Sequence, residues 1–301
     1  MTPLRALLDR SERVVLMGVL NCTPDSFSDG GLFGDEGAAV SRAAALVAAG
    51  AAVIDVGAES TRPGSTAVSG REQIARLGGV VRKIIAATGA LVSIDTTLPE
   101  VAEYALAEGA VIVNTVSLEP AAELGAVAAR AGAALVLMHS RGAMSAMKGF
   151  SVYADDAYRD VVSDVGREWS EAAGRALRAG LPRESLVLDP GLGFAKNAKQ
   201  SIALCARLDE LCALGFPVLV GPSRKSFLAR VAAPEGPLAP PDERLGGTIA
   251  AVLACVAKGA AIARVHDVAA VAQALAVDEA IHLQGGPRGV GLGLDRARRH
   301  A

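Results

Sequence analysis

Polar residues able to hold a flat, polar ring occur at intervals along the chain, each at the end of a short apolar run. Asp95, Asn114 and Asp189 supply two carboxylates and an amide, and Lys225 supplies an ammonium group. Carboxylates accept hydrogen bonds, an ammonium group donates them and an amide does both, so the set can match the edge of a polar heterocycle. We therefore predict a binding pocket for such a ring among these four residues.

A second group of residues carries hydrogen-bond donors and positive charge. Asn21, Arg62, Arg264 and His266 are of the types that bind a diphosphate. Taken singly, residues at strand ends have ordinary structural explanations. An aspartate there often caps the following helix, and a histidine in an apolar strand, such as His139, is more often simply hydrogen-bonded. The prediction of a joint site depends on all of them meeting at one rim.

The elements that must bring these residues together alternate between short apolar runs and longer helical segments. The apolar runs predict strands at Val14–Asn21, Ala52–Val56, Leu91–Asp95, Val111–Thr115, Ala134–His139, Leu186–Asp189, Val218–Gly221 and Ala261–His266. The segments between them predict helices, among them Gly37–Ala49, Arg71–Ala87 and Asp155–Ala179. Strict alternation favours a parallel sheet, and eight such units fit a closed (β/α)8 barrel, whose functional residues stand at the carboxyl ends of the strands.

The predicted architecture is therefore an α/β fold, a single TIM barrel with long loops after strands 1 and 2. The barrel spans 14–284, an N-terminal extension covers 1–13, and the Gly- and Arg-rich segment 285–301 is predicted to be a mobile tail. The alternative is an open doubly wound sheet. It is disfavoured because the chain has neither a G-x-G-x-x-G nor a G-x-x-x-x-G-K-[ST] motif.

Composition and charge argue against several classes of function. The formal net charge is −2 and no basic run occurs before the last few residues, so we predict no nucleic-acid partner. No apolar run approaches the roughly 18 residues of a membrane span, and 1–13 lacks the apolar core of a signal peptide. The four cysteines form no C-x-x-C pair. We expect a cytoplasmic protein without a membrane partner.

Several motifs resemble those of the dihydropteroate synthase family. The run Met17–Gly31 closely resembles the first signature of that family, and Asp55–Gly64 resembles the second. Further matches follow in family order, among them Asp189–Lys196, Ser223–Ser226 and Arg264–Asp267. The resemblance covers the chain from about Val14 to Ala280. It implies a barrel transferase of folate biosynthesis that condenses 6-hydroxymethyl-7,8-dihydropterin diphosphate with p-aminobenzoate, giving 7,8-dihydropteroate and pyrophosphate.

The resemblance also implies roles for individual residues. The pterin ring is expected to contact Asp95, Asn114, Asp189, Lys225 and Arg264. The diphosphate is expected to bind Asn21, Arg62, Arg264 and His266, with Mg²⁺ bridging it to the Asn21 side chain. The p-aminobenzoate subsite is expected to be lined by Phe27, Thr61, Pro63, Phe194 and Ser226. The residues implied in catalysis are Asp29, Arg62, Lys225 and Arg264.

The implied reaction is a substitution at the exocyclic methylene carbon of the pterin. Pyrophosphate departs with the help of Mg²⁺ and the cationic residues, Asp29 stabilises the pterin cation, and the amine of p-aminobenzoate attacks. Sulfonamides, which mimic p-aminobenzoate, are expected to bind in its place. The family also suggests a homodimer, with Thr248–Ala257 and Val268–Ile281 as candidate interface helices.

The chain departs from the family pattern at one position that bears on the site. Thr115 follows Asn114, where the family usually has an aspartate, and this change is expected to weaken the support of Asn114. Two other functions fit part of the pattern, namely a pterin-binding methyltransferase domain and a non-catalytic pterin-binding paralogue. The first would not need the Thr61–Pro63 loop or Ser226, and the second would be expected to lack residues such as Asp29 or Arg62.

Overall fold

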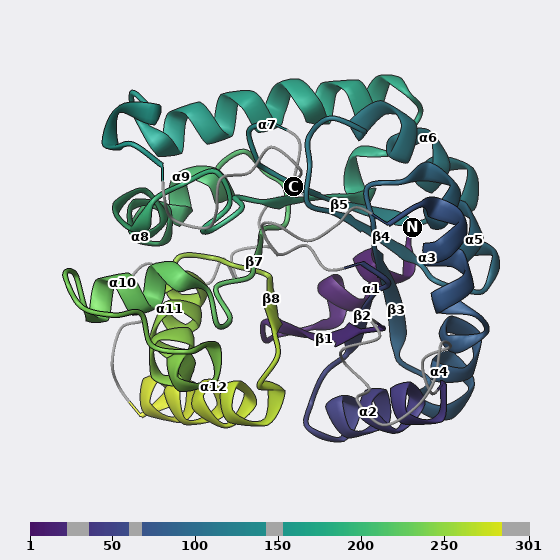
Figure 1. The fold of residues 1–301 in the computed structure, drawn as a ribbon, viewed down its shortest axis with the longest axis horizontal. Helices are drawn as coiled ribbons and strands as arrows, with labels where there is room; N and C mark the ends of the chain where they lie inside the picture. The colour runs from purple at the N-terminus through teal and green to yellow at the C-terminus, as the bar shows by residue number, and fades with distance from the viewer. Residues whose placement is uncertain (23–35, 60–67, 143–152, 285–301) are drawn as a thin grey trace.

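The protein is a closed parallel barrel surrounded by helices (Figure 1). The computed structural model describes residues 1–22, 36–59, 68–142 and 153–284. The strands in these ranges are β1 Val15–Asn21, β2 Val53–Gly57, β3 Leu91–Asp95, β4 Ile112–Thr115, β5 Ala134–Met138, β6 Leu186–Asp189, β7 Leu219–Val220 and β8 Ile262–Val265. They lie in the order β6-β5-β4-β3-β2-β1-β8-β7, and a parallel bridge between Leu188 and Val218 joins the two ends of this row. The predicted (β/α)8 barrel is confirmed, with strand ends that differ from the prediction by about one residue.

Alternation along the strands separates two cores. One face of each strand points outward and packs against the helices, in the larger of the two apolar clusters. The other face points inward, where Met17, Val53, Ile112 and Val136 are buried together. Successive strand residues face opposite sides, so the residues two positions further along each strand also face the barrel interior.

Helix α1 (Pro3–Arg10) fills the barrel interior at the amino ends of the strands. Thr2 caps this helix by accepting from the backbone N–H of Arg5 at 3.2 Å. Its residues Leu4 and Leu8 are buried in the same cluster as the inward strand residues. The segment 1–13, predicted only as an extension, thus contributes a helix to the core of the barrel.

The remaining helices surround the strands in Figure 1. They are α2 Glu36–Ala48, α3 Gly70–Leu77, α4 Val80–Thr88, α5 Pro99–Ala107, α6 Ala121–Ala131, α7 Val161–Arg178, α8 Ala198–Ala206, α9 Leu208–Cys212, α10 Ser226–Ala232, α11 Leu245–Ala257 and α12 Val268–Leu283. Short 3₁₀ turns occur at Asp155–Ala157, Arg183–Ser185 and Pro241–Arg244. Within the described ranges, no helix has the length and apolarity that crossing a bilayer requires.

Two predicted helices differ from the observed ones. The segment Arg71–Ala87 is not one helix but two, because Gly78 adopts a φ of +45° and Glu36 accepts a hydrogen bond from the N–H of Gly79 at 3.0 Å. A positive φ interrupts a right-handed helix, and glycine adopts it without a steric penalty. The segment from Asp155 begins with a 3₁₀ turn, and α7 starts only after Asp160, which caps it.

Candidate active site

The inward-facing row continues upward from apolar to polar residues at the carboxyl ends of the strands. Met17, Val53 and Ile112 belong to the apolar interior. Two residues beyond Val53 stands Asp55, and two beyond Ile112 stands Asn114. The same alternation places Asp95, Asp189 and Arg264 on the inner face of their strands, at the open end of the barrel.

Strand register brings several of these residues side by side. Asn21 of β1 pairs with Gly57 of β2, Gly57 pairs with Asp95 of β3, and Asp95 pairs with Asn114 of β4. The missing side chain at Gly57 leaves room in this row, because a Cβ built there would lie 3.7 Å from the Asp95 Cβ and 3.8 Å from the Asn21 Oδ1. The predicted pterin and diphosphate residues of β1, β3 and β4 are therefore neighbours.

The carboxyl ends of the strands, with Asp55, Asp95, Asn114, Asp189 and Arg264, form what we call the mouth of the barrel. Arg264 lies at its centre, where two carboxylates hold it. Its Nε donates to Asp55 Oδ2 at 2.6 Å, and its Nη2 donates to Asp95 Oδ2 at 2.9 Å. Asp55 Oδ2 also accepts from Asn114 Nδ2 at 3.0 Å. Burial alone would lower the pKa of Arg264, but its attraction to Asp55 and Asp95 raises the pKa above its ordinary value. The guanidinium is therefore a permanent cation, fixed in place by its neighbours.

Two carboxylate oxygens at this centre have no hydrogen-bond partner among the described residues. They are Asp55 Oδ1 and Asp95 Oδ1, and both are inaccessible to solvent. Burial raises the pKa of Asp95 above its ordinary value, although the charge of Arg264 opposes this shift. A buried carboxylate oxygen without a donor is energetically costly. These two oxygens are enclosed by the protein, so the two carboxylates serve to hold Arg264 and do not present their Oδ1 atoms to a ligand.

Asp189 and Lys225 form the opposite wall of the mouth. Asp189 Oδ1 accepts from the N–H of Gly191 at 2.7 Å, and burial raises the pKa of Asp189 while the charge of Lys225 opposes this. Lys225 Nζ donates to the carbonyl of Leu192 at 2.6 Å and lies 4.4 Å from the centre of the Phe194 ring. Burial lowers the pKa of Lys225 to about 8, against the attraction of Asp189.

The predicted diphosphate residues lie on the rim. Asn21 is exposed at the end of β1. His266 follows β8, where the Ser223 hydroxyl lies 3.0 Å from its Nδ1 and accepts its backbone N–H at 3.2 Å. Ser226 is the first residue of α10 and follows Lys225 directly. The predicted residues Phe27, Asp29, Thr61, Arg62 and Pro63 lie outside the described residues.

Comparison with known proteins identifies the family. Residues 17–266 match the model of the family described as pterin binding enzyme. The chain is 46% identical over 268 residues to the dihydropteroate synthase of Mycobacterium leprae, an alignment that covers 88% of this chain and 92% of the relative. The chain belongs to the dihydropteroate synthase family. The Synechocystis dihydropteroate synthase is 42% identical over 282 residues, which cover 92% of this chain and 93% of the relative.

Solved dihydropteroate synthase structures share the fold. The enzyme from Xanthomonas albilineans with 4-aminobenzoic acid superposes with a TM-score of 0.80 and 39% identity, over 92% of this chain and 95% of that one. The enzyme from Thermus thermophilus in complex with 6HMPPP superposes with a TM-score of 0.73 and 42% identity, over 90% and 95% of the two chains. The resemblance expected from the sequence is confirmed.

Two side chains at the mouth of this dihydropteroate synthase barrel were not predicted as site residues. Asp55 begins the second family motif, but no role in the site was predicted for it. The signal that identifies it is spacing, because Val53, Asp55 and Gly57 are two residues apart and so share the inner face of β2. Lys196 lies within a quoted motif but was given no role, and it is completely buried beside His139.

The departure of this chain from the family at Thr115 leaves Asn114 well supported. Thr115 lies one residue beyond Asn114 and so faces outward with Val113, away from the mouth. Asn114 is held by Asp55, and the Thr115 hydroxyl has no hydrogen-bond partner among the described residues. No side-chain contact of Thr115 in the structure supports Asn114, so the expected weakening is not seen.

Replacing Thr115 with valine should therefore leave activity unchanged and stabilise the protein. The substitution keeps the shape of the side chain and removes a buried hydroxyl without a partner, so we expect a gain of about 1 kcal/mol in the free energy of unfolding. Urea unfolding and steady-state kinetics on the same preparation measure both quantities. A drop in kcat/KM would show that Thr115 does support the site.

Proposed function

We propose that the mouth of the barrel binds the ring of 6-hydroxymethyl-7,8-dihydropterin diphosphate and joins its methylene carbon to the amine of p-aminobenzoate. The observation that carries this proposal is the gathering at one mouth of the acceptors Asp95, Asn114 and Asp189 around the fixed guanidinium of Arg264. Such acceptors suit a flat ring with N–H groups along its edge. The family, and the solved relatives with 4-aminobenzoic acid and with 6HMPPP, support the same reaction.

The residues of the mouth divide into two roles. Asp95, Asn114 and Asp189 accept from and donate to the ring edge, and Lys225 donates to a ring acceptor in place of the Leu192 carbonyl that it now contacts. Arg264 keeps its two carboxylate partners and faces the ring and the diphosphate with its remaining N–H groups. Asn21 and His266 stand on the rim beside the diphosphate, and Arg62 is proposed to join them.

The reaction that this arrangement supports is a displacement without a covalent enzyme intermediate. The bond from the methylene carbon to the diphosphate oxygen breaks, the amine nitrogen bonds to that carbon, and the amine releases one proton. Arg264 is fixed before the charge of the leaving group develops, so it stabilises pyrophosphate without reorganising. Asp29 is proposed to stabilise the pterin cation. Phe194 and Ser226, with Phe27, Thr61 and Pro63, are proposed to line the p-aminobenzoate subsite, where sulfonamides would compete.

Mg²⁺ is proposed to arrive with the diphosphate. Among the described residues no group of three His, Cys, Asp or Glu side chains is placed to hold a metal ion. The exposed amide of Asn21 supplies one oxygen, which fits Mg²⁺ because this ion commonly takes few protein ligands and completes its shell with phosphate oxygens and water. When bound, the ion would neutralise charge on the departing pyrophosphate.

A turnover assay tests the proposed function directly. Pyrophosphate release and formation of 7,8-dihydropteroate are followed with each substrate alone and with both, in the presence and absence of Mg²⁺. We expect both products only when both substrates and Mg²⁺ are present. Pterin binding without turnover would instead identify a non-catalytic paralogue, and methyl transfer to a corrinoid would identify the methyltransferase function.

The titration of Lys225 should be visible in pterin binding. Because burial lowers the pKa of Lys225 to about 8, the side chain carries its proton below that pH and loses it above. A donor that must be charged to bind then gives an affinity that is level below about pH 8 and falls by up to about tenfold per pH unit above it. Calorimetric titration with the pterin diphosphate across pH 6.5–9.5 measures this profile.

The matched control for this profile is Lys225→Gln. Its amide does not titrate, so any fall in affinity that it still shows above pH 8 belongs to the ligand or to another group. Identical pH profiles for the two proteins would contradict the assignment of Lys225 as the charged donor.

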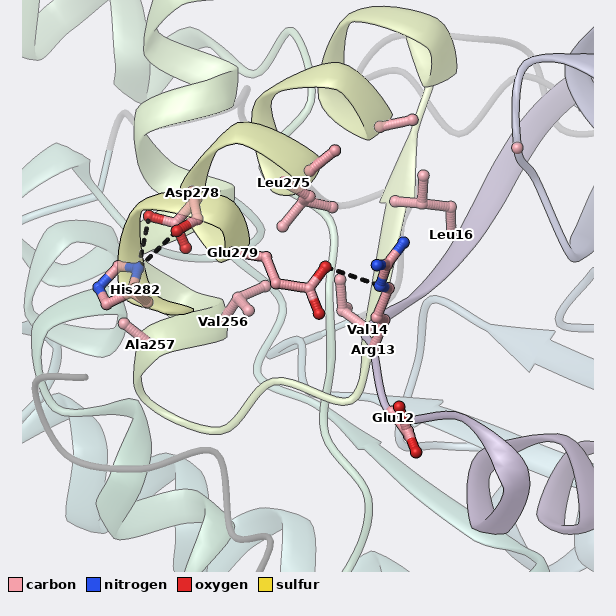
Figure 2. A pocket seen from close by; sticks show the side chains of 13 residues that line it. Glu12, Arg13, Val14, Leu16, Val256, Ala257, Leu275, Asp278, Glu279 and His282 are labelled. Atoms are coloured by element: carbon pink, nitrogen blue, oxygen red, sulfur yellow. Dashed lines mark hydrogen bonds and ion pairs between the residues drawn. The ribbon is translucent and has the colours of Figure 1, made fainter. Parts of the chain in front are cut away.

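A homodimer formed through α12 is the assembly that we propose. Val277, Ile281 and Leu283 of this helix are 55%, 65% and 74% exposed, which is unusual for large apolar side chains at neighbouring positions. Beside them, between β1, α11 and α12, lies an apolar pocket of about 280 Å³, edged by an ion pair between Arg13 and Glu279 (Figure 2). The cytoplasmic location expected from the sequence is likewise part of the proposal.

Placing a charge on α12 should dissociate the dimer. Ile281→Glu introduces a carboxylate into the proposed interface, whereas Ile202→Glu introduces one at a half-exposed position on α8. Sedimentation velocity is expected to give a dimer for the wild type and for Ile202→Glu, and a monomer for Ile281→Glu. A wild-type monomer, or a dimer that survives Ile281→Glu, would place the interface elsewhere.

A further inference from the structure

Lys196 is a fully buried lysine that the proposed chemistry does not use. Its Nζ lies within hydrogen-bond distance of three backbone carbonyls, those of Phe194 at 2.9 Å, Gly191 at 3.1 Å and His139 at 3.2 Å. The fourth contact is His139 Nδ1 at 3.0 Å. Within the described part of the chain no carboxylate forms an ion pair with it. Burial lowers the pKa of Lys196 well below its ordinary value, and the charge of Asp189 opposes this shift. The four acceptors around Nζ favour the charged form. A lysine kept here against that cost calls for a function.

The partner of Lys196 is itself fixed in one orientation. His139 Nε2 lies 3.0 Å from Glu168 Oε2, and a carboxylate only accepts hydrogen bonds, so Nε2 carries the proton and Nδ1 is free to accept from Lys196. Glu168 is in turn gripped by Arg141 through Nε and Nη2. Burial lowers the pKa of His139 to about 4, which keeps the ring neutral and suitable as an acceptor.

Two of the three carbonyls, those of Gly191 and Phe194, belong to the loop that connects β6 with α8, and the third, that of His139, directly follows β5. Gly191 in this loop donates its N–H to Asp189 Oδ1, which leaves the other Asp189 oxygen to face the mouth. Leu192 supplies the carbonyl that Lys225 contacts, and the ring of Phe194 lies under the Lys225 ammonium group. Three groups of the proposed pterin and p-aminobenzoate subsites therefore depend on the conformation of one loop.

The loop includes one residue in a conformation that it would not adopt by preference and one glycine that no other residue could replace. Ala195 has a φ of +50°, a region that non-glycine residues seldom occupy. Gly191 has a φ of +67°, and a Cβ at this position would lie 2.0 Å from the carbonyl oxygen of His139 and 3.3 Å from Lys196 Nζ. The loop passes so close to β5 that its shape must be held by neighbouring groups, and the Lys196 ammonium lies at the point of closest approach.

We propose that Lys196 is a positioning residue for both substrates. Its ammonium group binds the carbonyls of Gly191, Phe194 and His139 together and so fixes the β6–α8 loop. The fixed loop in turn orients the Asp189 carboxylate and the Phe194 ring toward the mouth. His139, Glu168 and Arg141 anchor this arrangement to α7. The inference rests on the proposed function, because it assigns Asp189 to the pterin and Phe194 to p-aminobenzoate.

The test separates positioning from a purely structural role. Lys196→Met keeps the length of the side chain and removes all its donors. If Lys196 positions the loop, the folded variant binds the pterin diphosphate with a raised Kd at an unchanged stoichiometry, and kcat/KM falls on the order of 10- to 100-fold. If its role is only structural, a smaller fraction of the protein is competent, so calorimetry gives a lower stoichiometry with the wild-type Kd.

Two further variants complete the experiment. Trp169→Phe removes the hydrogen bond from the indole N–H to the Leu137 carbonyl, which is 2.7 Å long and joins α7 to β5 without touching the loop. It is expected to lower the melting temperature and leave Kd unchanged. Lys196→Gln keeps two N–H donors on a shorter chain, and we expect a Kd between those of the wild type and Lys196→Met.

The outcomes distinguish the inference from the function on which it rests. A wild-type protein that binds no pterin diphosphate would overturn the proposed function. If the wild type binds and turns over but the folded Lys196 variants keep its Kd, only the positioning role is overturned. Should Lys196→Met not fold, the Kd of Lys196→Gln decides by the same criterion.

Discussion

Replacing Arg264 with methionine should remove most of the turnover and also destabilise the fold. Arg264 is the shared partner of Asp55 and Asp95, and without it both buried carboxylates lose their ion-pair partner. Removal of one member of a buried ion pair costs about 3–5 kcal/mol. The variant should also lose more affinity for the pterin diphosphate than for the bare pterin, because the guanidinium is proposed to reach the diphosphate.

The destabilisation by Arg264→Met should depend on pH. Without the arginine, burial raises the pKa of Asp95 further above the value it has in the unfolded chain, because the opposing charge is gone. A carboxyl with a raised folded-state pKa is protonated and tolerated at low pH, and its stabilising contribution is lost as pH rises through that pKa. The difference in unfolding free energy from the wild type should therefore be small near pH 4 and large at pH 8.

Urea unfolding at the two pH values measures this difference, with Arg224→Met as the control. Arg224 pairs with Asp267 outside the mouth, and both side chains are partly exposed, so its loss should cost about 1 kcal/mol or less. A pH-independent loss in Arg264→Met would mean that Asp55 and Asp95 do not depend on the arginine. Equal losses of affinity for the pterin and its diphosphate would show that Arg264 does not read the diphosphate.

Asp189→Asn should reduce pterin affinity by about 2–3 kcal/mol, or roughly 30- to 150-fold. The N–H of Gly191 donates to Asp189 Oδ1, so in the variant the amide oxygen will take that place and the NH₂ group will face the mouth. A donor would then meet the ring donors that the carboxylate is proposed to accept. Calorimetry with the bare pterin isolates this effect from the diphosphate.

The control for Asp189→Asn is a charge change of the same kind elsewhere. Asp160 caps α7 and pairs with Arg207 near the surface, so Asp160→Asn retains a capping side chain and should not alter pterin affinity. Circular dichroism confirms that both variants are folded. Wild-type affinity in Asp189→Asn would remove this residue from the ring-binding set.

The sequence predicts the barrel well because its signals are local. Apolar runs such as Leu91–Asp95 end where the strands end, and glycine closes several helices before the next strand. The break between α3 and α4 had a local signal in the adjacent Gly78 and Gly79, which was missed. The hydrogen bond that completes it comes from Glu36, 43 positions away from Gly79. The role of α1 was missed for a similar reason. Its Leu4 and Leu8 show an apolar helix face, but nothing local indicates that this face closes the barrel.

The sequence predicted which residues form the site better than it predicted the contacts between their side chains. Asp95, Asn114, Asp189 and Arg264 are brought to one mouth by the inward alternation of the strands, and Lys225 reaches it from the loop between β7 and α10. Their mutual contacts join residues up to 209 positions apart, as in the bond from Arg264 to Asp55, and no spacing in the sequence encodes them. The same holds for Lys196, whose partner His139 lies 57 positions earlier and shows its importance only when both are seen to be buried together.

In the part of the chain that the structure describes, α1 closes the barrel at the amino ends of the strands. Leu4 and Leu8 pack against the inward strand residues, so the barrel interior is apolar from this end up to its first polar layer, Asp55 with Arg264. A ligand bound on that layer must enter and leave through the mouth, which the second substrate also uses. If the pterin occupies the deeper position, p-aminobenzoate arrives above it and closes its exit, so the architecture imposes an order of addition that no individual contact would require.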